Sequence, residues 1–205
     1  MLTRRHLLHR GIALAVAAGS GGAIVAAGAR SDRETLRVTR FLVDARSNGA
    51  PAIRRVAERA GAEVLDAGSD LGPLLYGPLL RDWREGATDS LAGLTGAASL
   101  LFVERLAFDF GLRAVYVVRH AGEGTVAHRV RGPAPMSDAF AARLRLGDWR
   151  SAAVAASLAV PASARPLRLS QEHLAPDMVR DGALFSWTLV PAGVLASTTT
   201  RERRA

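Results

Sequence analysis

The stretch Leu36-Arg-Val-Thr-Arg-Phe-Leu-Val-Asp44 decides the fold, because it is the first of several β-favouring runs that alternate with helical stripes. It is rich in valine, leucine and phenylalanine and ends at the polar turn Ala45-Arg-Ser-Asn-Gly49, so it predicts a strand. Pro51 suits the first turn of a helix, and Gly61 suits the position after its last turn. The chain therefore begins a strand-to-helix pattern here.

The same alternation continues for three more strands. Glu63–Asp66 and Ser90–Leu94 predict two short strands, and Arg113–Val118 predicts a longer one. Before the last of these, Thr95 is expected to cap a helix that Gly111 closes. Connections this short favour right-handed crossovers and a mostly parallel sheet.

Two helical segments carry internal detail. Pro78 is expected to break a helix through residues 72–83, so its regular part should start near that proline. In the helix after Thr95, six positions are expected to divide into a buried stripe and a polar one: Ala98, Leu101, Phe102, Arg105, Leu106 and Asp109.

The pattern changes after residue 118. Arg119–Gly132 places a glycine-rich turn between two strand-like arms, which predicts a hairpin. Ser137 can cap a helix over residues 138–146, and Trp149–Val160 predicts another helix. Leu184–Val190 predicts a last strand at the sheet edge, and the polar tail 197–205 is expected to be disordered.

These elements predict an α/β fold with a mostly parallel, doubly wound three-layer sheet, Rossmann-like or flavodoxin-like, carrying a C-terminal hairpin and an edge strand. The expected organisation is a signal peptide over 1–29, one domain over 30–196, and the tail.

The opening residues predict export. Thr3-Arg4-Arg5-His6-Leu7-Leu8 resembles the twin-arginine (Tat) signal, although Leu7 stands where that pattern has phenylalanine and His9 where it has lysine. The resemblance implies recognition of Arg4 and Arg5 by the Tat translocase, which moves folded proteins, and a periplasmic location.

Behind this motif, Gly11–Ala29 is uncharged, has a glycine-rich centre and ends at Ala27-Gly28-Ala29, which has the form of a cleavage site. An uncleaved membrane anchor is the alternative, since a span needs about 20 residues. The weakly apolar centre favours cleavage before Arg30. The membrane is then expected to be contacted only through the signal segment.

Composition bounds the remaining chain to one domain of about 176 residues. The formal charge is +8, and it becomes +5 when three arginines leave with the signal and no acid goes with them. All 27 basic residues are arginines, and they are interspersed with acids, so nucleic-acid binding is not favoured. The absence of cysteine excludes disulfides and thiolate chemistry.

Polar residues follow each of the first four strands, where the carboxyl ends of parallel strands meet. They are Asp44, Arg46, Ser47 and Asn48 after the first strand; Asp66, Ser69 and Asp70 after the second; Thr95 and Gly96 after the third; and Arg119 and His120 after the fourth.

The two arginines of this cluster point to an anionic ligand, because a guanidinium binds carboxylate or phosphate and turn formation does not require it. Ser47, Asn48 and Thr95 are expected to help bind that ligand beside Arg46 and Arg119. The alternatives are a surface salt bridge between Arg46 and Asp44, and ordinary turn and cap roles for the others.

A catalytic alternative uses His120 as general acid or base, with Asp44 or Asp66 orienting it and Arg46 or Arg119 stabilising negative charge. It predicts a hydrolase- or transferase-like reaction. No phosphate-binding loop, dinucleotide-binding glycine pattern or nucleophile elbow supports it.

His120 and His128 lie on opposite arms of the predicted hairpin and face one another if its register permits. With Glu123 they have the composition of a metal site, but the spacing matches no metal-ligand motif, so no metal is predicted. The sequence therefore predicts an exported protein that binds a small anionic ligand or serves as a co-exported accessory subunit. It identifies no cofactor.

Overall fold

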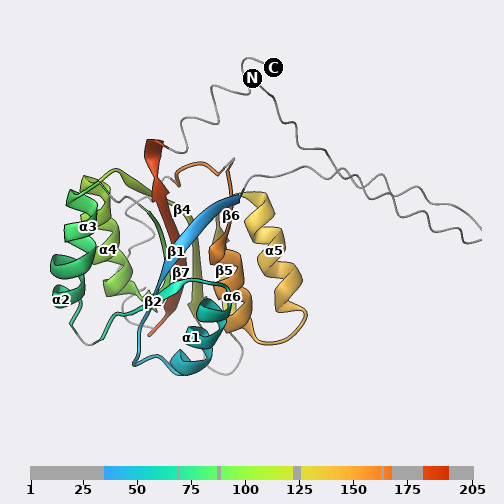
Figure 1. Cartoon of the computed structure of the whole chain (residues 1–205). Coiled ribbons are helices and arrows are strands. Elements are labelled where there is room, and N and C mark those ends of the chain that lie inside the picture. Colours follow the sequence, from blue (N-terminus) through green and yellow to red (C-terminus); the bar gives the residue numbers. More distant parts are fainter. Residues whose placement is uncertain are drawn as a thin grey trace, which may run out of the picture. The chain divides into compact units, whose positions relative to one another are not determined.

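A seven-stranded mixed sheet lies at the centre of the fold, in the order β2-β1-β3-β7-β4-β5, with β6 paired to the start of β1 (Figure 1). The computed structural model describes residues 35–68, 70–86, 89–121, 126–162, 164–167 and 182–193. The strands are β1 Thr35–Val43, β2 Glu63–Asp66, β3 Ser90–Gly96, β4 Leu112–Ala121, β5 Ala127–Arg131, β6 Ala159–Pro161 and β7 Leu184–Pro191.

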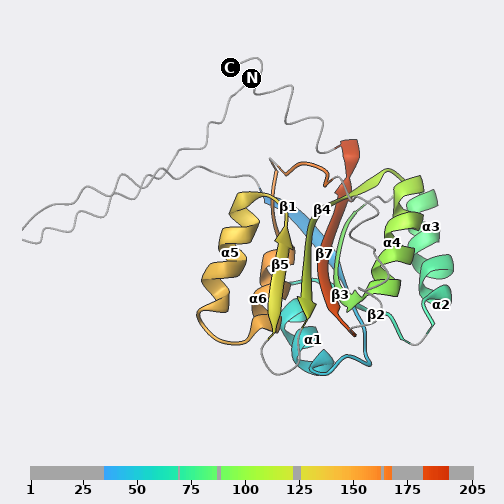
Figure 2. The ribbon, with the colours of Figure 1, turned by 180° about the vertical axis from the view of Figure 1, so that it is seen from behind.

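Helices cover both faces of this sheet, so the predicted three-layer α/β arrangement is confirmed. They are α1 Ala50–Arg59, α2 Gly72–Leu74, the π-helical turn η1 Leu75–Leu79, α3 Leu80–Arg84, α4 Ala97–Asp109, α5 Ala134–Leu144 and α6 Trp149–Leu158. One face packs against α1, α5 and α6, and the other against α4 and the segment from α2 to α3 (Figures 1 and 2).

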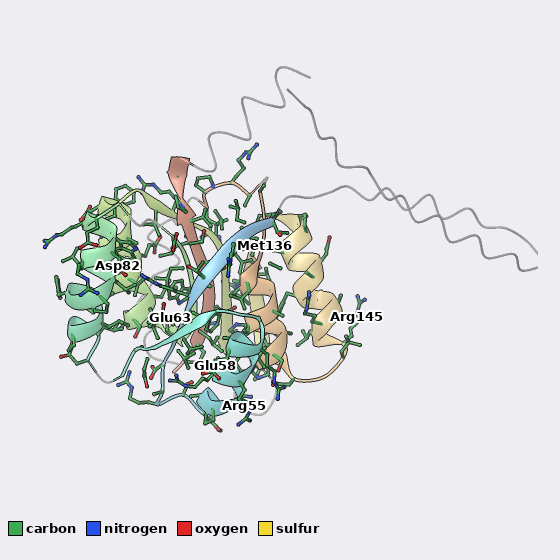
Figure 3. The ribbon with its side chains drawn as sticks, viewed as in Figure 1. Arg55, Glu58, Glu63, Asp82, Met136 and Arg145 are labelled. Atoms are coloured by element: carbon green, nitrogen blue, oxygen red, sulfur yellow. The ribbon has the colours of Figure 1, made fainter. Side chains whose placement is uncertain are left out.

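Helix α1 shows how residue spacing selects the buried side. Ile53 and Ala57 are fully buried against the sheet, whereas Arg55 and Glu58 are exposed and point away from it (Figure 3). Gly49 precedes the helix with a φ of 94°, in the left-handed region that glycine adopts without steric cost.

The prediction of a mostly parallel sheet is wrong. Among the described strands, β1–β2 and β1–β3 are the parallel pairs, while β3–β7, β7–β4, β4–β5 and β1–β6 are antiparallel. Because β7 runs opposite to both of its neighbours, β3 and β4 still point the same way. The carboxyl ends of β1 to β4 therefore lie at one edge of the sheet, as the site prediction requires.

The prediction of an edge position for the last strand is also wrong, because β7 lies between β3 and β4. Its sequence alternates apolar and hydroxyl side chains, which is typical of a strand that has one face exposed to solvent. Here the hydroxyls are buried as well: Ser186 Oγ lies 2.9 Å from His120 Nε2, and Thr188 Oγ1 donates to the Ser157 carbonyl at 2.7 Å. Hydrogen bonds to other residues of the core take the place of hydrogen bonds to water.

The predicted hairpin is confirmed by the antiparallel pair β4–β5, whose register places His120 opposite His128. One helix start and one helix end differ from the predictions. Helix α5 begins at Ala134 with Ser137 inside it, and α6 ends at Leu158, where the chain turns into β6.

Helix α4 begins one residue later than predicted. Gly96 is its N-cap, and Thr95 stays in β3. The predicted stripe is wrong, because the buried residues are Ser99, Leu100, Val103 and Ala107. The helix is apolar around most of its circumference, so residue spacing does not fix its orientation.

The predicted break at Pro78 is confirmed as a kink, with Gly77 in a non-helical conformation between two helical segments. A proline disfavours helical geometry in the residue before it, which explains the position of the kink.

The proposed signal over 1–29, including Arg4 and Arg5, and the tail over 197–205 lie outside the described residues. Within the described ranges, every helix is too short or too polar to span a bilayer. The chain contains no cysteine and therefore no disulfide.

Candidate functional site

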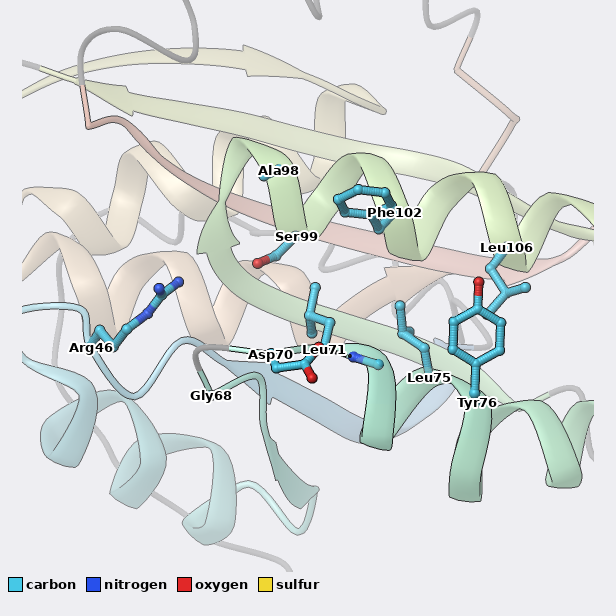
Figure 4. A pocket seen from close by; sticks show the side chains of 11 residues that line it. Arg46, Gly68, Asp70, Leu71, Leu75, Tyr76, Ala98, Ser99, Phe102 and Leu106 are labelled. Carbon is cyan, nitrogen blue, oxygen red and sulfur yellow. Dashed lines mark hydrogen bonds between the residues drawn. The ribbon is translucent and has the colours of Figure 1, made fainter.

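A cavity of about 450 Å³ opens at the carboxyl edge of the parallel strands, between the loops after β1 and β2 and the start of α4 (Figure 4). It is lined by Arg46, Gly68, Asp70, Leu71, Gly72, Leu75, Tyr76, Ala98, Ser99, Phe102 and Leu106. Its volume falls in the range of small-molecule sites.

The N-terminus of α4 forms one wall of this cavity. No side chain of the described residues caps α4, so its first amide groups are open to a ligand and carry the positive end of the helix dipole. Ser99, in the first turn, is only 7% exposed, and its hydroxyl points into the cavity (Figure 4). This hydroxyl has no hydrogen-bond partner among the described residues, and its oxygen stays open to the solvent in the cavity.

Arg46 lines the cavity from the loop after β1. It also forms a salt bridge with Asp44, which was one of the alternatives considered from the sequence. Arg46 Nε lies 3.1 Å from Asp44 Oδ1 and Nη2 lies 3.2 Å from Oδ2. These hydrogen bonds, and then the carboxylate charge, raise the pKa of the guanidinium. Nη1 makes no hydrogen bond within the described ranges, and the Arg46 side chain is 61% exposed.

Asp44 is buried and lies beside the N-cap of α4, with Oδ2 3.9 Å from the place of a Cβ on Gly96. Its carboxylate also accepts the Arg46 backbone N–H at 3.0 Å. It therefore serves as an internal counter-ion to both Arg46 and the helix dipole.

Asp70 lines the same cavity from the loop after β2. Its Oδ1 accepts the Gly72 N–H at 2.8 Å, which fixes the carboxylate, and the residue is exposed. Asp66 does not line the cavity. Its Oδ1 accepts the Gly68 N–H, and its Oδ2 lies 3.6 Å from Nη2 of Arg54. Ser69 lies outside the described residues.

Four other predicted ligand-binding residues do not line the cavity. Ser47 and Asn48 belong to the turn before α1, and the Asn48 carbonyl accepts Arg150 Nε. The hydroxyl of Thr95 accepts the indole N–H of Trp187 at 2.9 Å. Arg119 lies on β4, opposite Phe185 and Arg129 of the neighbouring strands.

His120 belongs to a separate, buried cluster. Its Nδ1 lies 2.8 Å from Nδ1 of His128 and its Nε2 lies 2.9 Å from Ser186 Oγ, while its ring stacks on Trp149 at 4.6 Å between centroids. Phe140 of α5 contacts both histidine rings.

Burial, and then the charges of His128 and Arg150, lower the pKa of His120 to about 3. Burial also lowers the pKa of His128. The Nδ1 contact needs one donor and one acceptor, so at least one of the rings is neutral there.

The structure does not bring His120 and Asp44 together: the hydrogen-bond partners of His120 are His128 and Ser186, and the acidic Asp44 pairs with Arg46. Glu123, the predicted third member of a metal site, lies outside the described residues. Within the described part of the chain, no three metal-ligating side chains come together.

Sequence reasoning missed Ser99, Tyr76 and Phe102. Ser99 stands three residues after the glycine that ends β3, and a serine in the first turn after a predicted strand is the signal that points to it. Tyr76 and Phe102 carry no comparable signal, because aromatic residues in such helices are usually part of the core.

Comparison with known proteins found no family model, no curated protein and no solved structure that matches the chain.

Proposed function

We propose that the protein binds a small carboxylate-bearing ligand in the cavity between Arg46 and the start of α4. The observation that carries the proposal is that Arg46 and the hydroxyl of Ser99 line the same cavity, beside helix amides that no described side chain caps. A ligand carboxylate would satisfy the hydroxyl and the amides, and Arg46 offers its free Nη1 to the same anion.

This proposal favours ligand binding over the role of an accessory subunit, since a hydroxyl and a guanidinium that line one cavity suit a ligand small enough to enter it. It also favours binding over catalysis by His120, because that ring is buried away from the cavity and its hydrogen-bond partners among the described residues are His128 and Ser186.

Replacing Arg46 with glutamine is expected to weaken the binding of butyrate about tenfold or more, because the change removes a charge-assisted hydrogen bond. Isothermal titration calorimetry measures this, with butyramide as the uncharged comparison compound. Arg55→Gln is the matched control, since it removes the same charge from an exposed site on α1 and should leave the affinity unchanged.

Asp44→Asn should act in the opposite direction. It removes the carboxylate that competes for Arg46 and keeps an oxygen that can accept the Arg46 N–H, so butyrate should bind several-fold more tightly. Equal affinities in the wild type, Arg46→Gln and Asp44→Asn proteins would contradict the proposal.

We further propose that this binding takes place in the periplasm after export by the Tat translocase. The support is the resemblance of Thr3–Leu8 to a Tat signal, followed by an uncharged segment and a small-residue cleavage site. Changing Arg4 and Arg5 together to lysine should stop export. Undiminished processed protein outside the cytoplasm would refute it.

A further inference from the structure

The cavity has two chemically different ends. Arg46, Asp70 and Ser99 lie at one end, and Leu75, Phe102 and Leu106 lie toward the other (Figure 4). A ligand that fills it must therefore combine charged groups with an apolar body.

The aromatic side chains at the apolar end of the cavity are more exposed than large apolar side chains usually are in a folded protein. Phe102 is 61% exposed and Tyr76 is 73% exposed, although each is large enough to stabilise a core. They stand on different elements, α4 and η1, and line the same cavity. An apolar group placed between them removes both from water.

The charged end holds an acid as well as a base. Arg46 is paired with Asp44, and Asp70 adds a second carboxylate whose Oδ1 is fixed by the Gly72 N–H. Asp70 Oδ2 makes no hydrogen bond within the described residues, so it is free to accept one. A ligand with only a negative charge would meet Asp70 unfavourably, whereas an ammonium group next to the carboxylate would pair with it.

We infer that the ligand is an apolar α-amino acid, a conclusion that rests on the proposed function and names its ligand class. The carboxylate contacts the α4 amides, Ser99 and Arg46. The ammonium contacts Asp70, and the side chain lies between Phe102 and Tyr76.

The test is a calorimetric comparison of four probes with the full chain: L-phenylalanine, 3-phenylpropionate, phenethylamine and L-alanine. Each of the last three lacks one group of the first, namely the ammonium, the carboxylate or the apolar ring. Phenylalanine should bind most tightly. Loss of the ammonium should weaken binding about tenfold, and loss of the ring should weaken it about thirtyfold or more.

Two variants connect these losses to the named residues. Asp70→Asn keeps the oxygen that caps Gly72, and should weaken phenylalanine about tenfold while leaving 3-phenylpropionate unchanged or tighter. Asp138→Asn, an exposed acid on α5, is its control.

Phe102→Ser should weaken phenylalanine about fivefold or more and leave alanine unaffected. Its control is Leu146→Ser, because Leu146 is an exposed apolar residue that does not line this cavity.

The inference is overturned if 3-phenylpropionate binds as tightly as phenylalanine and Asp70→Asn changes neither. The proposed carboxylate site then still stands, provided Arg46→Gln weakens both. If none of the four probes binds and butyrate does not bind either, the inference and the proposed function fall together.

Discussion

Replacing Gly93 with alanine is expected to lower the free energy of unfolding by about 3 kcal/mol, at the upper end of the cost of overpacking a core. Gly93 lies in the middle of β3, opposite Trp187 of β7. A Cβ there would meet Cζ2 of Trp187 at 2.5 Å and the Leu42 carbonyl oxygen at 2.9 Å. The indole cannot move aside freely, because its N–H is bonded to Thr95.

Chemical denaturation of the purified protein measures this loss. Gly193→Ala is the matched control, since a Cβ at Gly193 meets nothing within 4 Å, and its effect should stay within about 0.5 kcal/mol. If the two variants are equally stable, Trp187 does not pack over Gly93 as described.

Acidification is expected to destabilise the fold through the buried histidine cluster. The folded state holds the pKa of His120 at about 3, below the ordinary value of 6.5. His120 is therefore protonated near pH 6.5 in the unfolded chain, but only near pH 3 in the folded protein. The contribution of neutral His120 to the free energy of unfolding is fully present above pH 6.5 and is lost as the pH falls toward 3. By pH 4 the free energy of unfolding is lower by an amount on the order of 3 kcal/mol.

Variants separate this effect from the protonation of carboxylates. His120→Gln removes the titrating group and keeps a donor for Ser186, so the stability difference between pH 7 and pH 4 should shrink by most of that amount. His128→Gln should retain most of the difference, because the buried ring at His120 is unchanged. An identical pH dependence of stability in the wild type and His120→Gln proteins would show that His120 is protonated freely in the folded state.

The sequence predicted the elements whose signals are local. Helix α1 follows from one apolar stripe between Pro51 and Gly61, and β2 was predicted with its observed ends. The same holds for the hairpin, because a glycine-rich turn between two strand-like arms needs no distant partner.

The position of β7 could not be predicted, because it depends on a pairing between distant segments. The strand arrives after a long connection and inserts between β3 and β4. Its serine and threonine residues, Ser186 and Thr188, are buried, and their partners His120 and Ser157 come from other elements.

The cavity lies at the sheet edge where the sequence predicted a site, and its lining includes only some of the residues that were expected there. The common direction of β1 to β4 brought Arg46 and Asp70 to one edge, as expected from the topology. Thr95 was expected to bind the ligand, but it lies in β3 and its hydroxyl accepts the indole N–H of Trp187, whereas Ser99 of α4 lines the cavity.

A backbone amide NMR titration with butyrate tests most directly whether the cavity at the start of α4 is a carboxylate site. Saturable shifts are expected at the amides of Ala97, Ala98 and Ser99, with little change around His120 and His128. Shifts that saturate at the histidine cluster, or no saturable change at the three α4 amides, would contradict it.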